Sequence, residues 1–342
     1  MPERLNLVDV QKRLSPDAAS TYVAEILAKS SPLMKDAIWM PTNKTDSRTT
    51  QVRAGLPTVY KRKLNKGTKI SKSTVVQNEE GTTTFMAYGE NDILVIDSFG
   101  DQRGQAREDE AMSFVEALGQ AAEKELFYGN ADADPLGIYG LANRYNSLSA
   151  TDPISRNVIN AGGNTAADNL SIYFVKWSRN KAGLIYPKHA MSDARGIVDR
   201  KDMGIKEAEI GTGDDREIME VYRDRFRMSF GWCIPDWRSV VRICNVKVST
   251  LKDEAMQRNT AMTQSSLRFY MTQALHRLPA GDGMVRCYMN RSAAQALDME
   301  QMAGISNAGM TLMDVQGEQV TAFRGVPIRI DDNLINTEAV VA

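Results

Sequence analysis

The chain has 342 residues, of which 42% are hydrophobic and 25% are charged, an ordinary composition for a globular protein with a buried core. Its 42 Lys and Arg residues stand against 43 Asp and Glu residues, which gives a formal net charge of −1. A protein devoted to binding nucleic acid carries an excess of positive charge. The composition therefore argues against such a protein, and also against a disordered chain.

Cysteine usage and the N-terminus indicate the cellular compartment. Cys233, Cys244 and Cys287 are odd in number and lack C-x-x-C spacing, so they suggest neither a disulfide framework nor a zinc ribbon. We interpret them as buried thiols in a reducing cytoplasm. The start at Met1 has no apolar secretion segment, and no apolar run in the chain is long enough to span a bilayer. We expect synthesis in the cytosol and no membrane partner.

The first hundred residues predict an arm followed by a β excursion. Residues 18–29 have weak helical spacing of apolar side chains, which predicts one short helix before a loop. Residues 49–97 are rich in Thr, Val and Tyr, which favours a long, twisted β-hairpin or a pair of hairpins. Chain reversals are predicted at residues 65–67 and 78–81, where Asn and Gly occur.

A long helix is predicted over residues 105–128. Apolar side chains recur there at i+3 or i+4, at Ala111, Val115, Leu118, Ala122 and Leu126, and form one stripe. Acidic residues occupy its first part, where they suit the helix dipole, and Gly129 follows as a stop signal.

The remainder predicts a mixed α and β body. Short strands are expected in the runs 172–175, 220–230, 240–248 and 320–330, and helices in the runs 265–278 and 292–302. No repeat of fixed period occurs.

Residues that could support chemistry are few. His189 and His276 are the two histidines, and neither spacing nor context makes them a metal site or a general base. The acidic loop at residues 211–215 lacks the Lys-Ser or Lys-Thr of a phosphate loop, and the adjacent carboxylates at residues 331–332 suit a solvated turn as well as a cation. We predict no catalytic residue, no metal and no cofactor, and therefore not an enzyme. Trp232 and Trp237 are interpreted as core or subunit-contact residues instead of base-stacking residues.

Charge is segregated along the β excursion. Residues 48–72 contain eight Lys or Arg side chains and no acidic residue, whereas the following stretch to residue 110 is mostly acidic. A solvated face and a nucleic-acid patch both remain open. A long polar hairpin is marginal alone in water, so we favour a third interpretation, in which it pairs with an identical neighbour. The candidate subunit-interface residues are Arg53, Lys61, Arg62, Lys63, Lys66, Glu79, Glu80 and Glu90.

The order of elements resembles the major capsid proteins of tailed bacteriophages, in particular those of short-tailed phages, with the Hong Kong ninety-seven type fold, an α+β fold. The residues that carry the resemblance are the excursion 49–97 with Gly89-Glu90-Asn91-Asp92 before an apolar strand, the helix 105–128, the turn 134–141, the stretch 232–241 and the ending 323–331. The likeness covers nearly the whole chain, through combined order and local sequence.

The resemblance implies five parts. Residues 1–45 would be the N-terminal arm and 46–97 the extended β loop. Residues 98–150 would form the peripheral domain with its spine helix, 151–320 the axial domain region, and 321–342 a C-terminal strand that returns to the peripheral domain.

The resemblance also implies a function and partners. The protein would self-assemble into the hexamers and pentamers of an icosahedral head that encloses double-stranded DNA. Portal, scaffolding and cementing proteins would be further partners, with the scaffold a separate protein, and the virion would be built in the host cytoplasm. The alternatives are a cell-encoded encapsulating nanocompartment with the same fold, an enzyme of unfamiliar class, and a nucleic-acid-binding module that uses residues 48–72.

Overall fold

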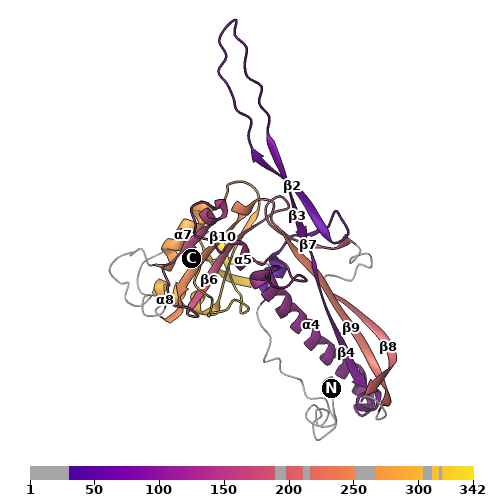
Figure 1. The fold of residues 1–342 in the computed structure, drawn as a ribbon. Helices are drawn as coiled ribbons and strands as arrows, with labels where there is room; N and C mark the ends of the chain where they lie inside the picture. Colours follow the sequence, from indigo (N-terminus) through magenta and orange to yellow (C-terminus); the bar gives the residue numbers. More distant parts are fainter. Residues whose placement is uncertain are drawn as a thin grey trace. The chain divides into compact units, whose positions relative to one another are not determined.

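The computed structural model describes residues 31–188, 198–210, 216–249, 251, 266–302, 310–315 and 318–342. The chain divides into two compact units. The described residues of unit 1 are 83–123, 198–210 and 216–229, and those of unit 2 are 31–82, 124–188 and all that follow residue 229. Figure 1 shows the elements of both.

Unit 1 is a twisted sheet packed on a long helix. Strand β9 (Glu217–Cys233) pairs with β8 (Val198–Ile210) on one side and with β4 (Thr83–Asp92) on the other. The helix is α4 (Arg103–Tyr128), preceded by the short helices α3 (Ile93–Asp97) and η1 (Gly100–Gln102). Leu118 and Ala111 of α4 pack against Phe226 of β9, and the ring of Phe114 stacks on Phe226 at 5.1 Å. The first part of the apolar stripe, from Ala111 to Leu118, thus belongs to the core of this unit.

Unit 2 is built on a seven-stranded sheet. Its strand order is β12-β13-β14-β11-β6-β10-β5. The bounds are β5 (Val158–Asn160), β6 (Asn169–Trp177), β10 (Val240–Lys247), β11 (Met284–Met289), β12 (Met310–Val315), β13 (Glu318–Phe323) and β14 (Val326–Ile330). All nine residues of the interior strand β6 are buried, as expected for a strand covered on both faces.

Each face of this sheet has its own cover. Helices α7 (Leu267–Arg277) and α8 (Arg291–Met302) contribute to the apolar cluster on one face. On the other face, Trp232 stacks on Trp177 of β6 at 5.7 Å and donates its indole N–H to the carbonyl of Leu126 at 2.9 Å. The short helices α5 (Leu141–Arg144), η2 (Pro153–Asn157) and η5 (Trp237–Ser239) complete the connections.

The first described residues belong to unit 2. Helix α2 (Pro32–Asp36) and strand β1 (Trp39–Pro41) precede the hairpin, and β1 pairs in parallel with β7 (Gly183–Tyr186). Leu33 is fully buried, and Asp36 accepts two hydrogen bonds from Arg329 of β14 at 3.1 Å each. Residues 31–41 of the expected arm therefore pack on unit 2. The short helix expected over residues 18–29 lies outside the described residues.

The β excursion is a two-stranded hairpin. Strand β2 (Ser47–Gly55) pairs with β3 (Thr74–Gly81) in antiparallel register from Ser47–Gly81 to Gly55–Thr74. The predicted reversal at residues 65–67 is confirmed, since Asn65 has φ 61° and the Lys66 amide donates to Lys63 at 3.3 Å. The reversal predicted at residues 78–81 is wrong, because these residues continue β3 opposite β2.

The spine helix, both later helices and the strands expected over 172–175, 220–230 and 240–248 are confirmed within a few residues. The single strand expected over 320–330 is wrong, because β13 and β14 pair there in antiparallel register and Arg324 and Gly325, both with positive φ, make the turn between them. Helix α4 ends at Tyr128, and a β-carbon on the next residue, Gly129, would lie 2.5 Å from the carbonyl oxygen of Ile138. The apolar strand expected after Asp92 is wrong, because the Asp92 carboxylate accepts the amide of Leu94 at 3.0 Å and begins helix α3. Strand β14 lies beside β11 in the seven-stranded sheet of unit 2.

Candidate functional site

The root of the β2–β3 hairpin is fixed to the body of unit 2 by a buried ion pair. Glu80 of β3 is 8% exposed, and Arg144 of α5 donates to its two carboxylate oxygens at 2.8 and 2.5 Å. Such a bidentate pair sets direction as well as position. Glu80 was a candidate for contact with a neighbouring subunit, but its carboxylate is taken up within its own chain.

A second carboxylate at the root is also satisfied internally. Glu79 accepts hydrogen bonds from Lys44 at 2.7 Å and from the hydroxyl of Ser47 at 2.5 Å. These two bonds lower the pKa of the Glu79 carboxyl below its ordinary value. The amide of Thr82 donates to the carbonyl of Asp46 at 3.0 Å and closes the root. The hairpin therefore leaves the body with both strands held.

Beyond the paired strands the hairpin carries exposed apolar side chains. Every residue from 56 to 73, here called the hairpin tip, is exposed. Within it Leu56 is 79% exposed, Val59 92%, Leu64 96% and Ile70 100%. Isolated exposed apolar residues are ordinary on protein surfaces. Four exposed apolar side chains on one two-stranded hairpin indicate a surface that another protein surface covers.

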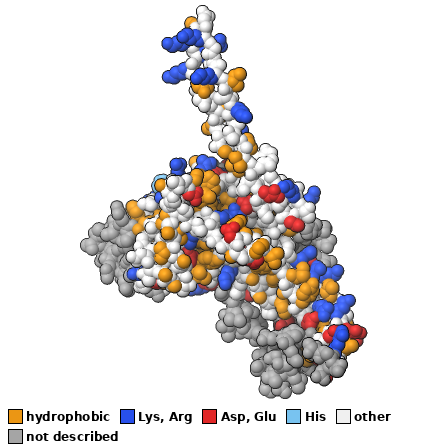
Figure 2. Space-filling model, in the orientation of Figure 1, with side chains coloured by type: hydrophobic (Ala, Val, Ile, Leu, Met, Phe, Trp, Pro, Cys, Tyr) orange, Lys and Arg blue, Asp and Glu red, His pale blue; other side chains and the backbone are white. Residues whose placement is uncertain are grey.

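The cations of the hairpin tip form no ion pair with any acidic side chain that the structure describes. Figure 2 shows Lys and Arg side chains gathered at the end of the projection, with hydrophobic ones between them. The Arg62 Nε donates to the carbonyl of Lys66 at 2.8 Å, which stabilises the reversal. None of the ion pairs that the structure describes involves Arg53, Lys61, Arg62, Lys63 or Lys66.

The last acidic candidate lies in unit 1. Glu90 of β4 is in an ion pair with Arg223 of β9 at 2.6 Å. The structure thus brings the five basic candidates together on one hairpin and gives each of the three acidic candidates a partner of its own. Only the basic half of the predicted interface is left open within the described residues.

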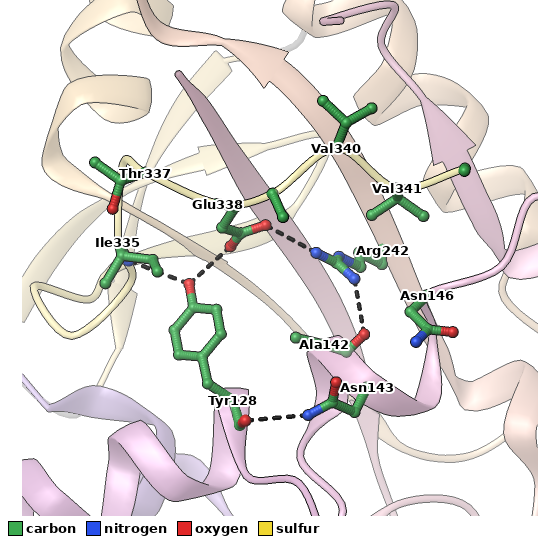
Figure 3. Close-up of a pocket in the computed structure, with 12 residues that line it drawn as sticks. Tyr128, Ala142, Asn143, Asn146, Arg242, Ile335, Thr337, Glu338, Val340 and Val341 are labelled. Atoms are coloured by element: carbon green, nitrogen blue, oxygen red, sulfur yellow. Dashed lines mark hydrogen bonds and ion pairs between the residues drawn. The ribbon is translucent and has the colours of Figure 1, made fainter. Parts of the chain in front are cut away.

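A pocket of about 370 Å³ lies where the C-terminal segment crosses unit 2 (Figure 3). Arg242 of β10 and Glu338 form an ion pair at 2.8 Å, and their side chains are only 4% and 5% exposed. The Tyr128 hydroxyl donates to Glu338 at 2.7 Å and accepts the amide of Ile335 at 3.1 Å. Burial, followed by the Glu338 charge, raises the pKa of Tyr128 far above its ordinary value.

Arg242, Glu338, Tyr128 and Asn245, which lie in or beside this pocket, are hydrogen-bonded within the chain. Arg242 also donates to Ser171 at 2.9 Å and to the carbonyls of Ala142 and Tyr145 at 2.8 and 2.9 Å. Asn245 both accepts the amide of Val341 and donates to its carbonyl, each at 2.9 Å. These hydrogen bonds hold the C-terminal segment against unit 2, because they join Glu338 and Val341 to Arg242, Tyr128 and Asn245. We call this set of contacts the C-terminal latch.

The remaining candidate chemical groups are dispersed. Cys233, Cys244 and Cys287 are buried free thiols, as interpreted from the sequence, and burial raises the pKa of Cys233 and of Cys244 to about 11. Asp332 is in an ion pair with Arg291 at 2.9 Å. His276 is exposed in the last turn of α7, whereas His189 and residues 211–215 lie outside the described residues. In the part of the chain that the structure describes, no three His, Cys, Asp or Glu side chains gather as a metal site.

Among the described helices, none is long and apolar enough to cross a membrane.

Comparisons with known proteins point in one direction. The family model described as major capsid protein GP7 matches residues 15–342. A solved structure of bacteriophage Epsilon15 is similar with a TM-score of 0.74 and 26% sequence identity, over 99% of this chain and 98% of that chain. The comparison with curated proteins gave no significant match.

Other solved structures are more distant. A structure titled Mycobacterium phage Adephagia has a TM-score of 0.41 and 12% identity, over 68% of this chain and 92% of that chain. An encapsulin complex from Synechococcus elongatus PCC 7942 has a TM-score of 0.41 and 11% identity, over 71% of this chain and 96% of that chain. The Epsilon15 similarity extends over the full length, including the hairpin.

Proposed function

This chain belongs to the major capsid protein GP7 family, and we propose that it builds the phage head by docking its basic hairpin onto neighbouring copies. The phage capsid fold and the short-tailed phage likeness expected from the sequence are confirmed. The protein is a major capsid protein of a tailed bacteriophage and a structural part of the virion. The proposed function is assembly of the shell and not catalysis, so the functional site is a surface that contacts other subunits.

The observation that carries this proposal is the hairpin tip. Its apolar side chains and its cations are left exposed by the rest of the described chain, while its root is held by the Arg144–Glu80 pair. A two-stranded hairpin is marginally stable alone in water. A neighbouring subunit supplies the missing surface, and a repeated self-contact is the means by which closed homo-oligomers form.

Magnitudes indicate which side chains matter. An exposed ion pair contributes about 0 to 1 kcal/mol, whereas full burial of one Leu, Ile or Val side chain contributes about 1.5–3 kcal/mol. Leu56, Val59, Leu64 and Ile70 therefore supply most of the docking free energy. The cations set orientation and suppress wrong contacts.

The complete assembly follows from the same proposal. Hexamers and pentamers of this chain form an icosahedral head in the host cytoplasm, enclose double-stranded DNA, and receive a portal, a scaffold and cementing proteins. Analysis of particle contents separates this function from that of a nanocompartment, because a phage head holds duplex DNA and a compartment holds protein cargo.

The test is the critical concentration for assembly of purified, nuclease-treated protein. The double substitution Lys61→Glu with Lys63→Glu is expected to raise this concentration at low salt and less at moderate salt, since screening weakens exposed charge contacts. Substituting Leu64 and Ile70 by Ser is expected to raise it at both salt concentrations. The matched control is Asp298→Asn, an exposed charge change on α8.

One result would show that the hairpin tip binds nucleic acid and not a neighbouring subunit. If the Lys61 and Lys63 reversals left the critical concentration unchanged but weakened binding to duplex DNA, with a smaller salt slope, the hairpin tip would be a phosphate-binding surface.

A further inference from the structure

The far half of the β8–β9 ribbon in unit 1 presents a sheet face that no other described element covers. Strands β8 and β9 pair in antiparallel register, and Glu207 of β8 stands directly opposite Glu220 of β9. Residues opposite each other in such a pair project from the same face. Glu207 and Glu220 are both exposed, so the ribbon carries two carboxylates side by side.

Apolar side chains flank this carboxylate pair. Tyr222 lies opposite Ile205, two residues along each strand in one direction. Ile218 lies opposite Glu209, two residues along in the other direction. Ile205 is 54% exposed and Ile218 is 65% exposed. The face is therefore a mixed surface, with two negative charges between two exposed isoleucines.

The carboxylate pair differs from its surroundings because no described Lys or Arg forms an ion pair with it. On the same ribbon Glu209 pairs with Arg216, and Asp202 pairs with Arg107 of α4 at 2.9 Å. Among the described residues, the side chain of neither Glu207 nor Glu220 takes part in an ion pair or a hydrogen bond. Like charges directly opposite on a sheet are destabilising. The isolated subunit thus contains two opposed carboxylates, and a partner surface with cations and apolar side chains would stabilise them.

The hairpin tip described above has the complementary chemistry. It offers Lys61 and Lys63 beside the exposed Val59 and Leu64, and these cations have no acidic partner among the described residues. Both surfaces mix apolar and charged groups, and their charges are opposite in sign. The acidic residues first expected to receive the hairpin, Glu79, Glu80 and Glu90, are already paired within their own chain.

We propose that the face formed by Ile205, Glu207, Ile218 and Glu220 is the surface on which the hairpin tip of a second copy docks. The inference rests on the proposed function, because it names the acceptor for the same hairpin. Docking places Lys61 and Lys63 between the two carboxylates and covers the isoleucines. The like-charge pair then becomes a contact that is satisfied only in the assembled shell.

A substitution that keeps side-chain shape separates assembly from folding. Glu220→Gln removes one of the two opposed charges, so the isolated subunit should melt at the same or a higher temperature. The same change should raise the critical concentration for assembly several-fold, whereas the control Asp298→Asn should leave it unchanged. A lower melting temperature, or an unchanged critical concentration, would overturn the proposal.

Charge exchange and cross-linking identify the partner directly. The quadruple variant with Lys61→Glu, Lys63→Glu, Glu207→Lys and Glu220→Lys should assemble better than either double variant. In wild-type shells made from a mixture of isotopically light and heavy subunits, a zero-length carbodiimide should join Lys61, Lys63 or Lys66 to Glu207 or Glu220 of different copies.

These experiments distinguish a wrong acceptor surface from a wrong proposed function. If the hairpin substitutions weaken assembly but the Glu207 and Glu220 substitutions do not, and the cross-links join the hairpin lysines to other carboxylates only, this acceptor is wrong while the docking function stands. If the hairpin substitutions have no effect on assembly, the proposed function itself fails.

Discussion

The C-terminal latch gives the sharpest prediction about stability. Glu338→Ala leaves the Arg242 guanidinium buried without its carboxylate, in a place where both side chains are at most 5% exposed. The hydroxyls of Ser171 and Tyr128 lose their acceptor at the same time. Removal of one partner from a buried ion pair costs about 3–5 kcal/mol. Each orphaned hydroxyl adds about 1 kcal/mol, although local rearrangement offsets part of the sum.

The assay is chemical denaturation of the unassembled subunit, followed by tryptophan fluorescence. Trp177 and Trp232 are both buried in unit 2 and report on the same unit as the latch. We expect a loss of about 3–5 kcal/mol in the free energy of unfolding for Glu338→Ala. Glu338→Gln keeps an acceptor and should lose less. A loss below about 1 kcal/mol for Glu338→Ala would show that the pair behaves as an exposed one and would refute the latch.

Three other predictions concern the remaining parts of the chain. Leu118→Asp introduces a carboxylate into the core of unit 1 and should destabilise the subunit by about 3–5 kcal/mol; normally assembled mutant protein would show that this helix face is open. The thiols of Cys233 and Cys244, with pKa values of about 11, should resist alkylation at pH 8 in native protein, because the thiolate is the reactive form; rapid labelling before unfolding would contradict their burial. Deletion of residues 1–45 removes the buried Leu33 and strand β1, so it should impair folding and not assembly alone, and circular dichroism of the truncated chain decides between the two.

Sequence reasoning succeeded where local signals agreed. Helix α4 combines an apolar stripe with a glycine just past its end, so periodicity and the stop signal gave the same answer. Its first turn holds no acidic residue, so the helix dipole did not mark its start. The hairpin tip was located by composition, and Asn65 supplied the positive φ needed for its reversal. Helix α3 was missed although Asp92 is a good N-cap residue, because a run of Ile, Leu and Val favours a strand by propensity.

The partners of several site residues are distant in sequence. Glu80 has its partner 64 residues away in Arg144, and no local pattern marks that pairing. The charge opposition of Glu207 and Glu220 depends on strand register, and a shift of one residue would place them on different faces. Glu338 is one acidic residue in a short tail, and its partner Arg242 lies 96 residues earlier. A tertiary structure is needed to find each of them.

The most direct test of the central claim is removal of the hairpin tip. Replacing residues 57–72 by a two-residue Asn-Gly turn should leave a folded subunit, because these residues are exposed and the Arg144–Glu80 pair at the root is kept. Electron microscopy and sedimentation of the purified proteins should then show shells or capsomers for wild type and only unassembled, folded subunits for the variant. Closed shells of normal size from the shortened chain would contradict the claim that this hairpin joins the subunits.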